Sequence, residues 1–265
     1  MDLQLLKEVL SVPTKTYKED LMINFLVNYI HEKKYDFYLD GMNNIYITKK
    51  TDDVEYFPCV VAHTDTVHNI DTINIVEEQL PNEQGDIKLA LKAYNDNNKP
   101  TGIGGDDKCG VFACLSLLDQ LPNLKVAFFV SEETGCHGSM NADDEFFENV
   151  GYVIEFDAPG NSMVTEYCWG VQLFERGGEF FNVCDEVLTE GFNNRNDYQT
   201  HPYTDVMALK RKYNFSCINF AIGYYDYHTR NEYVVIEDVF NGIKTGKNMI
   251  EKLGCKHYPL KSILV

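Results

Sequence analysis

The chain has 265 residues, 44% of them hydrophobic, and its 41 acidic and 23 basic residues give a formal net charge of −18. This length and composition suit one large soluble α/β domain or two small ones. Because an acidic surface repels phosphate backbones, we do not expect a nucleic-acid partner. The acidity either serves solubility or attracts cationic groups, such as the amino termini of peptides.

Eight cysteines are spread along the chain, and no two of them form a Cys-x-x-Cys pair. Neither a zinc ribbon nor a thioredoxin motif is therefore indicated. The N-terminal segment has no basic region followed by an apolar stretch, and no run approaches the roughly 18 apolar residues that a membrane helix needs. We expect a cytoplasmic protein with free thiols and no membrane partner.

The first part of the chain predicts two helices, two short strands and a hairpin. The helices span 2–10 and 17–33, and the strands span 36–38 and 44–48. An apolar face at helical spacing supports the second helix, with Leu21, Phe25, Leu26, Val27 and Ile30. Residues 71–95 alternate loosely between apolar and polar and predict a peripheral hairpin with its turn at 82–85, within an insertion at about 68–100.

Four short apolar runs rich in Val, Ile and Phe are typical of strands buried on both faces. They cover residues 57–62, 126–130, 152–156 and 217–222. Helical segments accompany them at 107–120, 141–148, 204–213 and 236–253. This alternation predicts an α/β fold, namely a single three-layer domain over 1–265 with a central, mostly parallel (mixed) sheet and helices on both faces.

Histidine or carboxylate side chains follow each of the four apolar runs: His63, Glu132 with Glu133, Asp157, and His228. In open α/β sheets, ligands bind beyond the carboxyl ends of the strands. Because several strand ends bring such side chains to one edge of the sheet, the sequence predicts a functional site at that edge.

Asp65 lies two residues after His63. At a strand end, its carboxylate can accept a hydrogen bond from the second imidazole nitrogen and make the first a better metal ligand. A lone His-x-Asp pattern would be a surface turn. The context of the strand ends favours the functional interpretation.

A glycine-rich segment over 102–105 is followed by Asp106, Asp107 and Lys108. Glycines let the backbone approach a site closely. The alternative is a simple glycine loop whose aspartate caps the next helix. A phosphate-binding loop is disfavoured, since its sequence pattern is missing and the acidic pair would repel phosphate.

Glu132 and Glu133 are adjacent, so their side chains leave the strand in different directions. One carboxylate can then bind a metal while the other faces the substrate as a general base. An isolated pair of glutamates is usually just solvated.

Together these motifs resemble the co-catalytic dinuclear zinc exopeptidases, in the branch of peptidase T, aminoacylases and carboxypeptidases. The motifs that carry the resemblance are His63-Thr64-Asp65, Gly105-Asp106-Asp107-Lys108, Ser131-Glu132-Glu133-Thr134-Gly135, Asp157 and His228-Thr229-Arg230. Their order agrees with that family along nearly the whole chain.

The resemblance implies two divalent metal ions, Zn²⁺ or alternatively Co²⁺ or Mn²⁺. It implies that Asp106 bridges both ions, that His63 and Asp157 complete the first site, and that Glu133 and His228 complete the second. It also implies a cis peptide bond after Asp106.

Two further residues would serve catalysis. Asp65 would stand behind His63, and Glu132 would be the general base that acts on a metal-bridging water. The reaction implied is hydrolysis of peptide bonds in short peptides, with a small peptide as the partner.

Many relatives carry a lid domain, which often dimerises, between the segments that match Asp157 and His228. The interval is too short here for such a domain, so we expect a monomer or an oligomer that does not depend on a lid. Thr204-Asp205 partly matches a Gly-Gly-Thr-Asp-like segment, and His201 could stabilise an oxyanion. Alternatively, Thr204 or Asp205 caps the following helix and His201 is a surface residue.

The first functional interpretation is a metal-dependent exopeptidase, most simply an aminopeptidase. An N-acyl amino acid deacylase or a carboxypeptidase with the same metal centre is the second, and a catalytically silent metal- or protein-binding module is the third. The intact Glu132 argues against the third. His31, His68, His137 and His257 are expected to be surface or packing residues, and Tyr224, Tyr225 and Tyr227 either line a pocket or pack.

Overall fold

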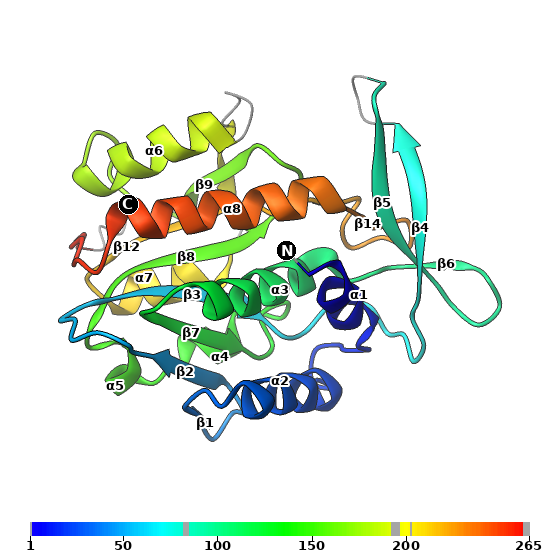
Figure 1. The fold of residues 1–265 in the computed structure, drawn as a ribbon, viewed down its shortest axis with the longest axis horizontal. Helices are drawn as coiled ribbons and strands as arrows, with labels where there is room; N and C mark the ends of the chain where they lie inside the picture. The colour runs from blue at the N-terminus through cyan, green and yellow to red at the C-terminus, as the bar shows by residue number, and fades with distance from the viewer. Residues whose placement is uncertain (1, 82–84, 192–196, 202, 262–265) are drawn as a thin grey trace.

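A computed structural model describes residues 2–81, 85–191, 197–201 and 203–261. Its main sheet has nine strands (Figure 1). In spatial order they are β1 (Phe37–Leu39), β2 (Ile45–Lys49), β7 (Leu124–Phe129), β3 (Phe57–His63), β8 (Val150–Ala158), β12 (Ser216–Ala221), β9 (Met163–Cys168) and β10 (Val171–Gln172), with β11 (Asp197–His201) paired to β9. The sheet is mixed, because β7, β3, β8 and β12 run parallel whereas β1, β2 and β10 pair antiparallel.

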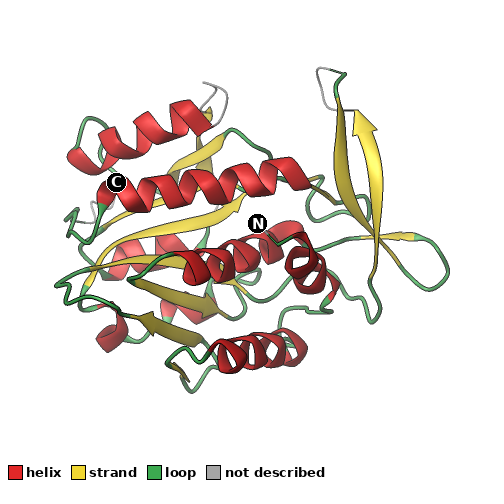
Figure 2. Cartoon of the chain, viewed as in Figure 1, coloured by secondary structure: helices red, strands yellow, loops and turns green. Residues whose placement is uncertain are grey.

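Eight helices accompany the strands in the described ranges: α1 (Leu3–Ser11), α2 (Asp20–Lys33), α3 (Gly105–Gln120), α4 (His137–Met140), α5 (Asp144–Phe147), α6 (Glu179–Gly191), α7 (Asp205–Lys212) and α8 (Ile236–Leu253). In Figure 2, α3 and α8 lie in front of the central strands, and α4 and α7 lie behind them. The predicted architecture, a mostly parallel central sheet between helices, is confirmed.

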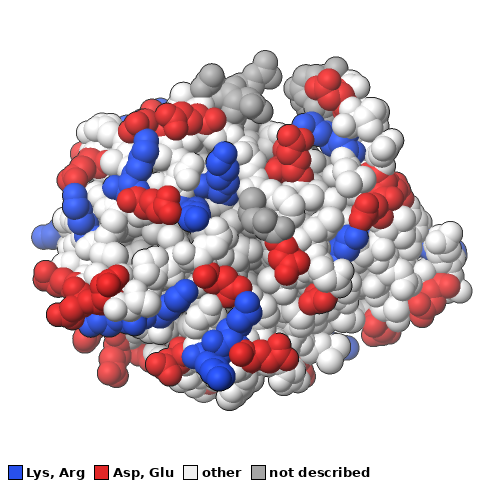
Figure 3. Space-filling model, viewed as in Figure 1, with Lys and Arg blue, Asp and Glu red and all other residues white. Residues whose placement is uncertain are grey.

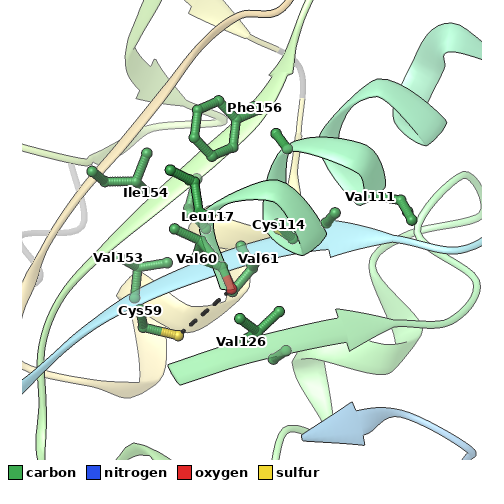
Figure 4. Close-up of a cluster of buried hydrophobic side chains, with 14 of the residues drawn as sticks. Cys59, Val60, Val61, Val111, Cys114, Leu117, Val126, Val153, Ile154 and Phe156 are labelled. Carbon is green, nitrogen blue, oxygen red and sulfur yellow. Dashed lines mark hydrogen bonds between the residues drawn. The ribbon is translucent and has the colours of Figure 1, made fainter. Parts of the chain in front are cut away.

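Part of the core lies between α3 and the parallel strands (Figure 4). Every residue of β3, β7, β8 and β12 is buried, as their continuous apolar runs predict. Val61, Cys114 and Leu117 are among the core residues with no exposed surface. Burying one Val or Leu side chain contributes about 1.5–3 kcal/mol, so this packing fixes the relative positions of the strand ends.

A second sheet is antiparallel and has five strands. They are β13 (Tyr224–Tyr225), β14 (Tyr233–Val235), β5 (Ile87–Tyr94) and β4 (Asn74–Pro81), with β6 (Pro100–Thr101) paired to β5. The predicted hairpin is thus present as β4 and β5, standing on the side to which the arrowheads of β7 and β8 point (Figure 1). Most of its predicted turn, residues 82–84, lies outside the described residues.

Several elements differ from the sequence predictions. Helix α2 starts at Asp20 rather than at 17, because Lys15 and Lys18 form a β-bridge around Tyr17, whose φ is 65°. Its buried face is made by Met22, Leu26 and Ile30, whereas Leu21 is exposed.

The predicted helix over 141–148 is wrong in its bounds. Two short helices, α4 and α5, replace it, and Asp143 caps the second by accepting a hydrogen bond from the backbone N–H of Glu145. Strands β9, β10 and β11 and helix α6 were not located from the sequence. They lie in the interval between Asp157 and His228, and the three strands are joined to the main sheet.

Acidic and basic side chains are interspersed over the face shown in Figure 3. All eight cysteines lie in the described ranges and are free, and seven of them are buried. None of the helices in those ranges combines the length and apolar character that a bilayer crossing requires.

Candidate metal centre

The five predicted metal ligands come together in two overlapping groups. The first contains His63, Asp106 and Asp157, and the second contains Asp106, Glu133 and His228. Within each group, the potential ligand atoms all lie within 4.8 Å of one another. The sequence prediction that these side chains meet is therefore confirmed.

The parallel strands explain this convergence. His63 is the last residue of β3, Asp157 lies just before the end of β8, and Glu133 follows β7. Asp106 stands at the start of α3, and His228 lies in the loop between β13 and β14. Each segment thus contributes at the carboxyl edge of the sheet, where such folds bind ligands.

Asp106 is the residue that the two groups share. Its Oδ1 lies 3.1 Å from His63 Nε2, and its Oδ2 lies 3.2 Å from His228 Nε2. Burial would raise the pKa of Asp106, but hydrogen bonds from His228 and His63 outweigh burial and hold the pKa below its ordinary value. The peptide bond between Asp106 and Asp107 is cis, as the family resemblance implies. With one oxygen facing each group, Asp106 has the geometry of a bridging carboxylate.

Asp65 orients His63 from behind. The Nδ1 atom of His63 lies 3.2 Å from Asp65 Oδ1 and 3.0 Å from the Asp65 carbonyl oxygen. Because both oxygens are acceptors, Nδ1 carries the hydrogen and Nε2 faces Asp106 and Asp157. This is the arrangement that the His-x-Asp spacing predicts.

Asp65 also holds the loop that carries the two glutamates. Its carboxylate accepts hydrogen bonds from the backbone N–H of Glu132 at 3.0 Å and of Glu133 at 3.3 Å. The hydroxyl of Thr16 donates to the same carboxylate at 2.7 Å. The side chain of Asp65 is fully buried, so these contacts connect the positions of three site residues rigidly.

Glu132 is almost completely buried and lies beside His63, a member of the first ligand group. Its Oε2 is 3.8 Å from His63 Nε2, and the thiol of Cys136 lies 3.4 Å from its Oε1. Burial, together with the nearby carboxylates of Asp157, Asp205 and Asp106, raises the pKa of Glu132 well above its ordinary value, although His63 opposes the shift. A carboxylate in such surroundings is well suited to accept a proton.

His228 and Glu133 form the more open side of the site. The His228 side chain is 44% exposed, and its Nε2 lies 3.1 Å from Glu133 Oε2. Hydrogen bonds to Asp106 and Glu133 raise the pKa of His228 to about 10. This side of the site is therefore accessible from solvent, whereas the His63 side chain is fully buried.

Asp157 is held by two residues that sequence reasoning did not assign to it. The Tyr224 hydroxyl donates to Asp157 Oδ1 at 3.1 Å, and the side chain of Asn219 bonds both backbone groups of Asp157, at 2.8 and 2.6 Å. Tyr224 is fully buried here, so it supports a ligand rather than lining an open pocket.

The predicted substrate residues divide into two kinds. His201 is half-buried at the end of β11, and its Nδ1 donates to the Tyr203 carbonyl at 2.9 Å, which leaves Nε2 available. Burial lowers the pKa of His201, against the opposing effects of its hydrogen bond to the Tyr203 carbonyl and of the Asp106 carboxylate.

Thr204 and Asp205 are fully buried. The Thr204 hydroxyl donates to Glu155, and the Ser139 hydroxyl donates to Asp205 at 2.5 Å. Thr204 occupies the N-cap position of α7, as the alternative interpretation expects, but its side chain makes no capping hydrogen bond. Both side chains are therefore enclosed by protein.

Glu232 is a further residue that sequence reasoning missed. Its buried carboxylate accepts hydrogen bonds from the backbone N–H groups of Gly104 and Asp106 and contacts His68. His68 therefore has a specific partner, contrary to its expected role as an unpaired surface or packing residue. The only signal in the sequence is an acidic residue four positions after His228.

The donor set fits a pair of divalent cations. Imidazole nitrogens and carboxylate oxygens suit Zn²⁺, Co²⁺ and Mn²⁺. The carboxylates raise the pKa of His63 well above its ordinary value even though burial opposes this, so the cluster favours positive charge at its centre. Each group supplies three protein donors, with Asp106 common to both.

No protein-family model matches this sequence, and no curated protein does. Solved structures do match. Aminopeptidase PepT from Bacillus cereus has a TM-score of 0.77 at 13% identity, covering 95% of this chain and 97% of that one. A tripeptidase from Staphylococcus aureus has a TM-score of 0.76 at 12% identity, with the same coverage.

A TET aminopeptidase from the marine sediment archaeon Thaumarchaeota archaeon matches over 95% of this chain and 97% of its own, with a TM-score of 0.68 at 12% identity. At such identities the similarity concerns the fold. The two ligand groups lie at the carboxyl edge of that fold's central sheet. The chain therefore has the fold of aminopeptidase PepT and of the TET aminopeptidase.

Proposed function

We propose that this protein is a metal-dependent aminopeptidase that hydrolyses short peptides. The observation that carries the proposal is the position of Asp106, which faces both histidines while Glu132 lies beside them. The similarity in fold to an aminopeptidase and a tripeptidase supports the same reaction class.

Two divalent cations, proposed to be Zn²⁺, would supply Lewis acidity and would lower the pKa of a water molecule. His63, Asp157 and Asp106 would hold the inner cation, and Asp106, Glu133 and His228 the outer one. The chain's own residues determine the remaining chemistry, beginning with the orientation of His63 by Asp65.

Glu132 is the proposed general base. Its carboxylate would accept a proton from the attacking water and would deliver it to the leaving amine as the peptide bond breaks. The raised pKa of Glu132 supports this role, because a group with too low a pKa is a weak base. Buried surroundings also keep bulk water away from the proton that Glu132 transfers.

His201 is the proposed oxyanion-stabilising residue. Because its Nδ1 is bound to the Tyr203 carbonyl, the ring orientation is fixed. In the tautomer that this contact requires, Nε2 can donate only when the ring is protonated, so we expect activity to depend on the charge of His201.

The proposed substrate is a small peptide with a free amino terminus, which the acidic site attracts. The free, mostly buried cysteines are in keeping with a reducing cytoplasm as the proposed compartment. A deacylase or carboxypeptidase with the same metal centre is the second candidate, because the ligand groups alone do not select the substrate.

A matched panel of peptides tests the proposal. Dipeptides and tripeptides with free or acetylated amino termini would be incubated with the metal-loaded protein. Cleavage of only the free-amine series is expected. Cleavage of the acetylated series would instead favour the deacylase or the carboxypeptidase, and metal binding without any hydrolysis would favour a silent module.

The variant Glu132→Gln tests the base. We expect turnover to fall by about 10²–10⁴ while metal content is unchanged. Glu145→Gln, at a carboxylate on the short helix α5 away from the ligand groups, is the matched control. Normal turnover of Glu132→Gln would remove Glu132 from the mechanism.

A further inference from the structure

Glu232 joins three segments that carry proposed metal ligands. It follows His228 by four residues, and its side chain has no exposed surface. Its Oε2 accepts a hydrogen bond from the backbone N–H of Gly104 at 2.8 Å and lies 2.7 Å from His68 Nε2. Its Oε1 accepts from the backbone N–H of Asp106 at 3.2 Å. Both carboxylate oxygens are therefore in use.

The peptide unit between Ile103 and Gly104 is held from two sides. Its N–H donates to Glu232, and its carbonyl accepts a hydrogen bond from Lys108 Nζ at 3.2 Å. Lys108 is itself buried and also donates to the Leu10 carbonyl at 3.0 Å. Since opposite ends of one peptide unit are bound, that unit cannot rotate without breaking a buried hydrogen bond.

The glycines of this loop are explained by the same contacts. A Cβ added to Gly102 would lie 2.0–2.3 Å from ring atoms of His68. A Cβ added to Gly105 would lie 2.6 Å from Tyr224 Cβ and 3.4 Å from Glu232 Oε1. The loop therefore lies so close to Glu232 and its partner that side chains at these positions do not fit.

These contacts restrict the backbone of Asp106, the next residue of the loop. Asp106 must present one oxygen to each ligand group, so a small rotation of its backbone would misalign both contacts at once. Among the described side chains, only that of Glu232 accepts a hydrogen bond from the backbone N–H of Asp106. His68 belongs to the segment that follows His63, so the same carboxylate also ties that segment to the loop of His228.

We propose that Glu232 is a positioning residue that fixes the backbone of Asp106 and thereby sets the metal affinity of both ligand groups. His68 assists by holding the Glu232 carboxylate. This inference rests on the metal centre of the proposed function, but not on peptide hydrolysis. Its test therefore measures metal binding, which stays informative whether or not peptides are cleaved.

The experiment compares full-length Glu232→Gln and Glu232→Ala with the unaltered protein in competition with a chromogenic chelator for Co²⁺ and Zn²⁺. Glutamine keeps one acceptor but turns an N–H₂ donor toward the second backbone N–H, so it cannot replace the carboxylate. We expect both metal equivalents to bind about 10–100-fold more weakly. A change in the Co²⁺ absorption spectrum should accompany this loss.

Glu237→Gln is the matched control, because Glu237 lies only five residues further along, is exposed, and pairs with Lys88 on the surface. Its metal affinity should equal that of the unaltered protein. If Glu232→Gln and Glu232→Ala bind both metals within twofold of the unaltered protein, the proposal is overturned, even if their melting temperatures fall.

His68→Ala tests the same proposal at the partner of Glu232. The His68 side chain is 13% exposed, whereas that of Glu232 is fully buried. If the Glu232 variants do not fold, the metal affinity of His68→Ala decides whether the proposal stands. Weaker binding of both metals is expected, and unchanged affinity would contradict the positioning role.

Discussion

Replacing Gly110 by alanine is expected to destabilise the protein, although alanine is the better helix former. Gly110 lies in α3, where alanine would ordinarily contribute about 1 kcal/mol of stability. A Cβ at this position would lie 2.2, 2.5 and 2.6 Å from the three carboxyl atoms of Asp107. These distances are far below van der Waals contact, so the Asp107 side chain must move.

The displaced carboxyl makes two buried hydrogen bonds. Asp107 Oδ1 accepts from the N–H of Gly110 at 3.0 Å, and Oδ2 accepts from the N–H of His63 at 3.2 Å. Losing both costs about 1–3 kcal/mol, and overpacking costs about 1–3 kcal/mol more. After subtracting the helix propensity, we expect a net loss of about 3 kcal/mol in the free energy of unfolding.

Urea denaturation of Gly110→Ala and Gly41→Ala measures this difference. Gly41 has no neighbour within 4 Å of an added Cβ and no positive φ, so its alanine variant should be as stable as the unaltered protein or slightly more stable. Since Asp107 also holds the backbone of His63, Gly110→Ala should bind metal more weakly. Equal unfolding free energies for the two variants would refute this reasoning.

Two further predictions concern Asp65 and Lys125. Asp65→Asn should weaken metal binding about 10–100-fold in chelator competition, because the amide cannot accept every hydrogen bond of the carboxylate. The control Asp53→Asn, at an exposed carboxylate, should leave metal binding unchanged. Equal metal affinities of the two variants would exclude the orienting role of Asp65. Burial lowers the pKa of Lys125, so between that value and 10.5 the unfolded chain binds more protons and stability rises with pH. Lys125→Met should flatten this rise at pH values below 10.5 in urea denaturation, while the exposed Lys256→Met should keep it, and an unchanged slope in Lys125→Met would count against the burial argument.

The ligand groups could be predicted because they follow from local pattern and topology. Continuous apolar runs mark the buried parallel strands, and such strands end at one edge of a sheet. His63 and Asp157 are therefore found by reading to the end of each run. Asp106 needed the resemblance as well, because a glycine loop followed by aspartate has an ordinary structural explanation.

The supporting residues could not be predicted in the same way. Glu232 acts through the backbone N–H of Asp106, and Thr16 acts through the side chain of Asp65. Both partners are distant in sequence, and no periodicity marks such contacts. The strands of the interval before His228 were missed for a different reason. β11 is partly exposed and polar, so it has no apolar run, and its place is decided by pairing with β9.

Asp106 also makes the two ligand groups thermodynamically dependent on each other. A cation bound by one group changes the charge and freedom of a carboxylate that belongs to the other, and linkage requires the effect to be equal in both directions. The groups differ in access, since His63 has no exposed side-chain surface whereas 44% of His228 is exposed. Exchange of two such cations with solvent would then be sequential, with the cation held by Glu133 and His228 arriving last and leaving first.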